Sequence, residues 1–213
     1  KAYLSECEKD NPKAISYFKM RCGSQPQQKY IRFHPKDHAI ACIVVDPITK
    51  IGIGIHRLML DKKGNDLIKV NGKRLKMTLG SSTVKGGVFI AYEANPSANI
   101  NEKFWVIAEG IENAVGLKRI FKNGMSLGFV VGTPFEHTDW RNITFAATIN
   151  AFNAASIQLP TDAHILFFCD LDNAGRDAAH SFKDKNPQTI IIDNYSIDGH
   201  DPLDLMTILF SRL

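Results

Sequence analysis

Apolar runs that alternate with segments of helical spacing fill the second half of this 213-residue chain and constrain its fold most. The runs lie at 104–109, 126–133, 164–170 and 188–193, and each has the length of a buried strand. The segments between and after them space their apolar residues as helices do, at 111–121, 141–152, 174–183 and 201–210. Strands that alternate with helices form parallel sheets covered on both faces. Residues 101–213 are therefore predicted to form an α/β domain with a four-stranded parallel sheet flanked by helices.

The first half of the chain has a different pattern of helix, strand and turn signals. Residues 1–23 read as one or two short helices, with a helix start at Asn11-Pro12 and a stop at Gly23. Beyond them, β-prone runs are separated by turn signals, and they lie at 39–46, 50–60, 76–80 and 86–92. This pattern predicts a smaller α+β domain with a mainly antiparallel sheet. The polar stretch 93–103 places the boundary between a domain of residues 1–100 and one of residues 101–213.

Charge is distributed unevenly along the chain, whose formal net charge is +4. Lys and Arg gather between positions 29 and 85, and Asp gathers between 162 and 204. A basic half beside an acidic site suits a metal-using enzyme that acts on polyphosphates. The four cysteines form no Cys-x-x-Cys pair, so we expect reduced thiols in the cytoplasm rather than a zinc ribbon. No apolar run approaches the ~20 residues that span a bilayer.

Acidic residues follow three of the expected strands. Glu109 ends the first strand, Asp170 and Asp172 end the third, and the fourth leads to Asp201 and Asp204. Carboxyl ends of parallel strands share one rim of a sheet, and carboxylates gathered there repel one another unless a cation lies between them. Mg²⁺ prefers such oxygen ligands, which indicates metal-assisted phosphoryl or nucleotidyl transfer. Each motif also has an ordinary structural explanation: a turn for Glu-Gly, a helix cap for Asp-x-Asp, a helix start for Asp-Pro.

The order of these motifs resembles a known family. "VIAEGIENA", "FFCDLDNAGRDAA" and "GHDPLDLM" resemble the Toprim pattern of primases, topoisomerases and some nucleases, over about residues 103–213. Ahead of them, "IGIGIHRLMLDKKG" and "GKRLKMTLGSS" run in the order seen in primases. The motifs "GIHR" and "EGIE" resemble those of the phage and plasmid primase-helicase group more than those of the chromosomal enzymes. The chain thus resembles the catalytic core of phage- and plasmid-type DNA primases.

The resemblance implies a reaction and a set of roles. A ribonucleotide 3′-hydroxyl would attack the α-phosphate of the next ribonucleoside triphosphate on a single-stranded DNA template, and a replicative helicase would be a partner. Asp170 and Asp172 would hold Mg²⁺ or Mn²⁺, and Glu109 would be a further metal ligand or the general base. Asp201 and Asp204 would hold a second ion. The basic residues implied to contact phosphates are Arg57, Lys76, Lys85 and Arg176, the last of which could instead orient a carboxylate.

The chain also departs from the family pattern. Replicative primases have an Asp where this chain has Asn113, with Glu112 one residue earlier, and a Gly where it has Leu171. Residues 1–213 contain neither a zinc ribbon nor a Walker A motif. Two alternatives therefore stay open beside primer synthesis: a Toprim nuclease that hydrolyses phosphodiesters, and a non-catalytic nucleic-acid-binding domain of a larger replication protein.

Overall fold

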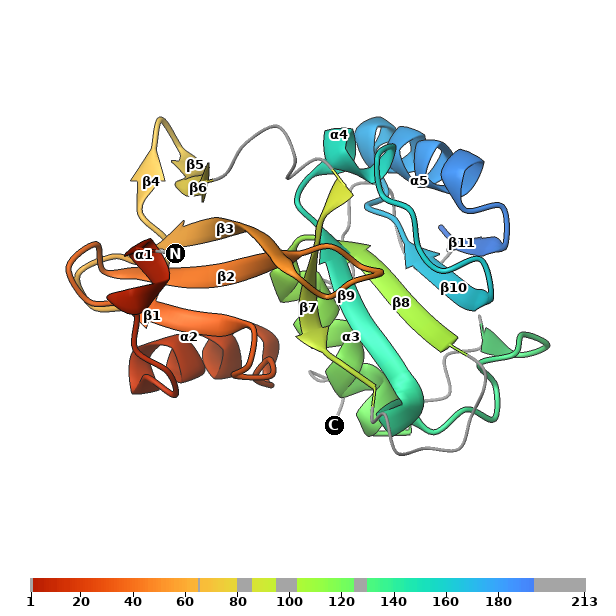
Figure 1. Cartoon of the computed structure of the whole chain (residues 1–213), viewed down its shortest axis with the longest axis horizontal. Coiled ribbons are helices and arrows are strands. Elements are labelled where there is room, and N and C mark those ends of the chain that lie inside the picture. Colours follow the sequence, from red (N-terminus) through yellow and green to blue (C-terminus); the bar gives the residue numbers. More distant parts are fainter. Residues whose placement is uncertain (1, 65, 80–85, 95–102, 125–129, 194–213) are drawn as a thin grey trace.

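One mixed sheet of nine strands runs through the described part of the chain. The computed structural model describes residues 2–64, 66–79, 86–94, 103–124 and 130–193. Within them, the sheet has the order β11-β10-β8-β9-β7-β2-β3-β6, and β1 pairs with β2 (Figure 1). The predictions made for Lys85, Asp201, Asp204 and the helix at 201–210 fall outside the described residues.

The α/β architecture predicted for the second half is confirmed. Four strands pair in parallel here: β8 (Lys103–Glu109), β9 (Ile143–Thr148), β10 (Ala163–Phe168) and β11 (Thr189–Ile192). Two longer helices flank them: α3 (Ile111–Lys122) and α5 (Asn173–Lys185). Because β8 pairs with both β9 and β10, its carboxyl end lies between theirs, which places Glu109 at the centre of the rim.

One helix of the sequence prediction is wrong, and one expected strand is not found in the part of it that the structure describes. The run 126–133 was expected to be a strand, but its described residues form turns closed by local bonds such as Thr133 N to Val130 O at 3.1 Å. The segment 141–152 was expected to be a helix, yet it forms β9 followed by the short helix α4 (Ala151–Ala154). All six residues of β9 are buried. A strand buried on both faces shows no alternation, so hydrophobic periodicity cannot separate it from a buried helix.

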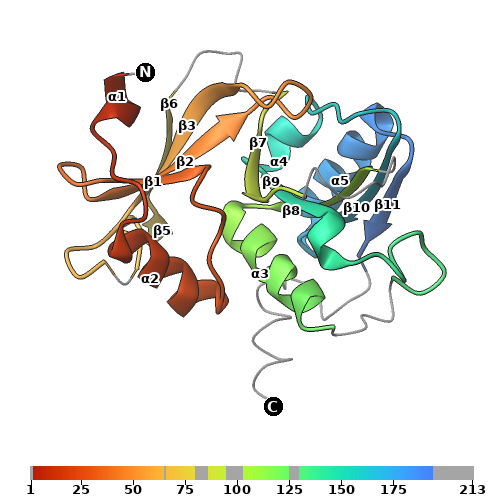
Figure 2. The same cartoon turned by 60° about the horizontal axis from the view of Figure 1, so that its bottom comes forward.

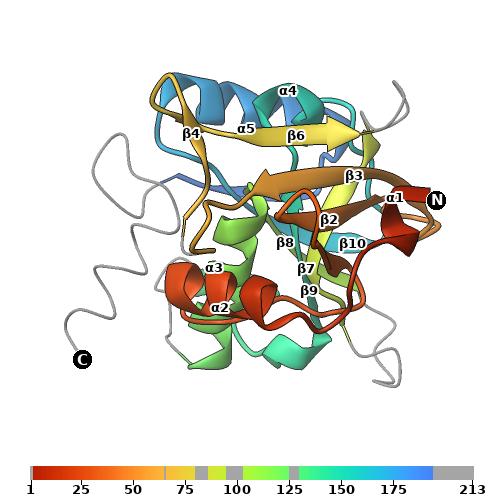
Figure 3. The same ribbon diagram turned by 90° about the vertical axis from the view of Figure 1, so that its left-hand side faces the viewer.

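The first half is mainly antiparallel, as expected. Its strands in the large sheet are β1 (Ile31–His34), β2 (Ala39–Val45), β3 (Gly52–Met59), β6 (Lys76–Leu79) and β7 (Val88–Tyr92). Figure 3 shows β6, β3 and β2 in succession. Strand β7 pairs antiparallel with β2 on one side and with β9 on the other. The two halves of the chain therefore share one continuous sheet. A separate two-stranded hairpin joins β4 (Lys69–Val70) to β5 (Lys73–Arg74).

Helices cover both faces of the sheet and enclose a core on each side. On one face, α2 (Pro12–Cys22) and α3 lie side by side (Figure 2). The start and stop predicted for α2 are confirmed, since Asn11 Oδ1 accepts from Lys13 N at 2.9 Å and Gly23 closes the helix with a φ of 61°. On the other face, α4 and α5 pack together, and α1 (Ala2–Ser5) lies near the N-terminus. No described helix combines the length and apolar character that crossing a membrane requires.

Candidate active site

Asn113 links the ends of two neighbouring parallel strands. Glu109 is the last residue of β8, and Asp170 follows β10 by two residues. The Asn113 side chain, in the first turn of α3, donates from Nδ2 to the Glu109 carbonyl at 2.8 Å and to Asp170 Oδ1 at 3.4 Å. The structure therefore brings Glu109 and Asp170 to one place, and Asn113 connects them.

A cavity of about 250 Å³ lies at this rim of the sheet. Glu109 and Asp170 line one part of it. Three cationic side chains line another part: Arg21 from α2, Arg74 from β5 and Lys76 from β6. Gly110, Glu112, Asn113 and Ile149 complete the lining. Carboxylates and cations thus face the same space, although they come from opposite halves of the chain.

Glu112 holds Lys76 at the edge of this cavity. The Lys76 Nζ lies 3.3 Å from the Glu112 carboxylate, and the Tyr17 hydroxyl donates to the same carboxylate at 3.2 Å. Burial raises the pKa of the Glu112 carboxyl, but the Lys76 charge and these hydrogen bonds outweigh burial and hold the pKa below its ordinary value. Burial and the Lys76 cation lower the pKa of His56 to about 4, so His56 adds no charge at pH 7. Glu112 is therefore an ionised partner of Lys76.

Asp172 occupies the N-cap of α5. Its Oδ1 accepts from Gly175 N at 2.7 Å, and the residue is exposed. Neither Asp172 nor Arg176, which lies in the first turn of the same helix, is among the residues that line the cavity. The structure thus gives Asp172 the helix-capping role that was the ordinary alternative for an Asp-x-Asp motif. Its role in metal binding stays a prediction.

Arg57 lies apart from Lys76. Arg57 stands opposite Met77 in the register of β3 and β6, and Leu58 stands opposite Lys76, so the two basic side chains point to opposite faces of the sheet. Arg57 Nη1 bonds to Asp37 Oδ2 at 3.1 Å, and its guanidinium lies 5.5 Å from the centre of the Tyr3 ring. Only 13% of the Arg57 side chain is exposed. The structure does not bring Arg57 to the cavity.

Two cavity cations were missed in the sequence. Arg74 lies in the basic run "GKRLK" together with Lys73 and Lys76, and it lines the cavity. This run of positive charge is a sequence signal that could have identified it. Arg21 lies in the last turn of α2, where a basic residue is favoured by the helix dipole whatever its function. Only the packing of α2 against α3 brings Arg21 to the rim.

No protein-family model and no curated protein matches this chain. Among solved structures, it is similar to the primase fragment of the bacteriophage T7 primase-helicase protein, with 13% sequence identity and a TM-score of 0.49. That match covers 92% of this chain and 66% of the other. It is also similar to a DNA primase domain from Pseudomonas aeruginosa, with 15% identity and a TM-score of 0.44, covering 84% of this chain and 52% of the other.

Both are primase structures. Primases are also the family whose motifs this sequence resembles. The chain spans 66% and 52% of the lengths of these two structures. At these identities and TM-scores the likeness assigns no activity, so the function proposed below depends on the residues of the chain itself.

The donor set at the cavity suits a hard divalent cation. Among the described residues, no group of three or more His, Cys, Asp and Glu side chains is placed to hold a metal. Three carboxylate residues nevertheless line the cavity: Glu112 is paired with Lys76, and Glu109 and Asp170 stand at the ends of β8 and β10. Mg²⁺ is commonly held by one or two carboxylates, with water and substrate phosphates as its other ligands. The residues present therefore fit Mg²⁺ or Mn²⁺ better than a metal that needs a complete protein cage.

Gly175 packs directly against Asp170 and leaves no room for a larger residue. A Cβ on Gly175 would lie 2.9 Å from the Cβ of Asp170 and closer still to its carbonyl oxygen. Gly175→Ala should therefore push the Asp170 segment away from the cavity and lower metal-dependent turnover about tenfold, since small displacements of catalytic groups are costly. Helix propensity favours Ala over Gly, which offsets part of the clash and keeps the protein folded.

Ala178→Gly on the same helix is the matched control for steady-state rates and thermal unfolding. It reverses the direction of the change at a buried position one turn further along α5. Turnover should be kept in Ala178→Gly even where its stability falls. Full turnover in Gly175→Ala would show that the close contact does not position Asp170.

Proposed function

We propose that this chain carries a metal-dependent nucleotidyl-transfer centre, which joins ribonucleotides on single-stranded DNA as a primase does. The observation that carries the proposal is the cavity where Glu109 and Asp170 meet Arg21, Arg74 and Lys76. Binding a nucleoside triphosphate with its divalent cation requires carboxylates for the cation and cations for the phosphates. Both kinds of group face the same space.

The cationic side of the cavity has capacity for an anion. The Arg21 Nε is buried and has no hydrogen-bond partner among the described residues. A buried donor without a partner is costly, and a phosphate oxygen would satisfy it. Lys76 is 36% exposed at its side chain, so it can reach a ligand while it stays near Glu112. Arg21, Arg74 and Lys76 would together orient the phosphates of the incoming nucleotide.

Glu109 and Asp170 would hold Mg²⁺ or Mn²⁺, which when bound neutralises charge on the triphosphate and makes the attacking hydroxyl more acidic. The 3′-oxygen of one ribonucleotide forms a bond to the α-phosphorus of the next, the bond to pyrophosphate breaks, and the hydroxyl proton leaves to Glu109 or to water. The protein contributes position and charge rather than covalent chemistry. Under this proposal Asp172 is a further ligand of the ion. Asp201 and Asp204, which lie outside the described residues, would hold a second ion.

The remaining assignments belong to the same proposal. Lys85, which lies outside the described residues, and Arg176 would contact phosphates. Arg57 would act only where nucleic acid passes the other face of the sheet. Single-stranded DNA and ribonucleoside triphosphates are the substrates. A replicative helicase in the cytoplasm is the partner that the resemblance to primases implies.

The test is direct synthesis. The protein is incubated with single-stranded DNA, labelled ribonucleotides and Mg²⁺ or Mn²⁺, and the products are separated on a denaturing gel. Short labelled oligonucleotides that require template and divalent cation are the expected result. Cleavage of the template without synthesis would replace the proposal with the nuclease alternative. Template binding without either product would leave the non-catalytic alternative.

A further inference from the structure

Positive charge is concentrated around the β4–β5 hairpin. Residues 62–76, which we name the basic hairpin, contain a single acidic residue, Asp66. Against it stand six cationic residues: Lys62, Lys63, Lys69, Lys73, Arg74 and Lys76. All six are exposed. Asp66 lies 3.9 Å from Lys69 and 3.6 Å from Arg74, so a large excess of positive charge remains.

The basic hairpin is fixed at its base and projects from the sheet. Ile68 N donates to Met59 O at 2.8 Å, Leu75 N to Ile68 O at 2.7 Å and Met59 N to Leu75 O at 3.2 Å. Its tip is a tight turn in which Asn71 and Gly72 both have positive φ, at 51° and 78°. Figure 1 shows β4 and β5 standing out beyond the end of β3. The structure thus presents these charges on an ordered arm.

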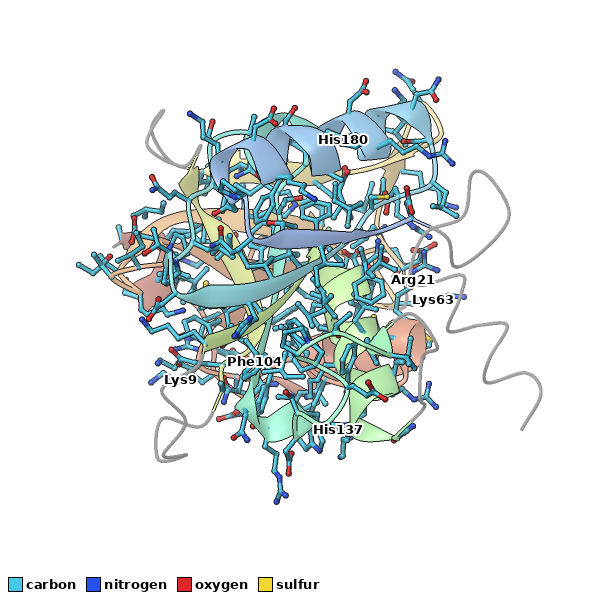
Figure 4. All side chains as sticks on the ribbon, turned by 90° about the vertical axis from the view of Figure 1, so that its right-hand side faces the viewer. Lys9, Arg21, Lys63, Phe104, His137 and His180 are labelled. Carbon is cyan, nitrogen blue, oxygen red and sulfur yellow. The ribbon has the colours of Figure 1, made fainter. Side chains whose placement is uncertain are left out.

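The cations of the arm continue into the cavity. Lys69 lies opposite Arg74 in the hairpin register, so both side chains point to one face, and Arg74 also lines the cavity. In the view of Figure 4, Lys63 from the start of the hairpin and Arg21 from α2 lie at the same edge of the molecule. Through Arg74, the positive charge of the hairpin reaches the cavity that Glu109 and Asp170 line.

The other face of the arm is apolar as well as basic. Val70 lies opposite Lys73, and Ile68 is on the same face as Val70. These two apolar residues are 51% and 39% exposed. A solvated charged loop gains nothing from exposing them. The unstacked bases of a single strand offer apolar surface beside a repeating phosphate charge, whereas a duplex stacks its bases inside. Lysines next to exposed aliphatic side chains match the single strand better.

We propose that the basic hairpin is a guide for single-stranded nucleic acid, whose backbone it holds as the strand enters the carboxylate cavity. On one face of the arm, Lys73 holds a phosphate beside Ile68 and Val70, which contact bases. On the other face, Lys69 and Arg74 hold phosphates nearer the cavity. The inference rests on the proposed function only for the identity of the strand as a template. The binding itself requires neither metal nor nucleotide.

The experiment measures binding without catalysis. Affinity for a labelled single-stranded oligonucleotide is followed by fluorescence anisotropy over a range of salt concentrations, in EDTA and without nucleotides. Each phosphate contact to a single strand contributes about 0.7 to the slope of log K against log salt. The variant Lys69→Ala/Lys73→Ala should therefore reduce the slope by about 1.4. The control Lys183→Ala/Lys185→Ala removes the same charge from exposed positions at the end of α5 and should leave the slope unchanged.

Failure of the hairpin and failure of the primase proposal give different results. A lower slope in the hairpin variant supports the guide even if no oligonucleotide is synthesised. An unchanged slope in the hairpin variant, or an equal fall in the α5 control, would overturn the proposed role of the hairpin. Neither result would bear on whether the protein synthesises primers. Affinity for duplex equal to that for the single strand would overturn the assignment to single strands.

Discussion

Replacing Asp170 with Asn is expected to lower primer synthesis on the order of 10²–10³-fold, the usual loss when one electrostatic group is removed from a catalytic centre. Asn has nearly the same size as Asp and keeps an oxygen that can accept from Asn113 Nδ2, which lies 3.4 Å from Asp170 Oδ1. The change therefore removes charge and leaves the packing between β10 and α5 intact. Initial rates in Mg²⁺ and in Mn²⁺, with unfolding curves of both proteins, measure the effect.

Asp162→Asn is the matched control for this experiment. Asp162 lies just before β10 begins, whereas Asp170 lies just after it ends, so the two residues occupy opposite ends of one strand. The Asp162 carboxylate is exposed and pairs with Lys103 Nζ at 2.9 Å. Its loss should leave synthesis unchanged. Equal losses in the two variants, or full synthesis in Asp170→Asn, would show that the carboxylate at the cavity is not part of a catalytic centre.

The meeting of Glu109 and Asp170 could be predicted from the sequence because it depends on a local rule. Each residue directly follows an apolar run, and parallel strands bring their carboxyl ends to one rim whatever the lengths of the helices between them. The register confirms the rule, since Ala108 of β8 pairs with Phe168 of β10. The prediction survived an error in the intervening strand because β9 replaced the run 126–133 without changing the number of parallel strands.

The basic side of the cavity could not be predicted in the same way. Which cations reach the rim depends on the packing of α2 against α3 and on which face of β6 meets the core. Arg57 and Lys76 were linked by motif order alone, yet strand alternation sends them to opposite faces. Arg57 instead lies beside Asp37 and Tyr3, contacts between segments far apart in the chain. Such tertiary contacts leave no signal in periodicity or spacing.

Replacing Lys76 with Met is expected to lower the free energy of unfolding by about 2 kcal/mol at pH 7, because breaking a buried ion pair leaves the other charge uncompensated. The estimate lies below the ~3–5 kcal/mol of fully buried pairs because 36% of the Lys76 side chain is exposed. Glu112 bears the penalty, since only 8% of its side chain is exposed and the Tyr17 hydroxyl would be its remaining side-chain partner. Urea unfolding of parent and variant measures the difference.

The loss should depend on pH in a defined direction. In the parent, the pKa of Glu112 lies below its ordinary value, so the pair stabilises the fold above the ordinary pKa of the carboxyl, and this stabilisation is lost as pH falls through the pKa of the folded state. Without Lys76, burial dominates and raises that pKa, and the neutral carboxyl is tolerated in acid. The deficit of Lys76→Met should therefore be largest at pH 7 and narrow toward pH ~4, near the ordinary pKa of Glu.

A second substitution separates the charge penalty from lost packing. Gln at position 112 removes the buried charge and keeps a group that can accept from the Tyr17 hydroxyl. Lys76→Met/Glu112→Gln should therefore be more stable at pH 7 than Lys76→Met alone, and its stability should change little between pH 7 and pH ~4 relative to the parent. Glu112→Gln by itself should cost less than Lys76→Met, because the partly exposed Lys76 ammonium can turn to water. Strict additivity of the two single changes would mean that the pair contributes no coupling and that Lys76 stabilises the rim through its aliphatic chain alone.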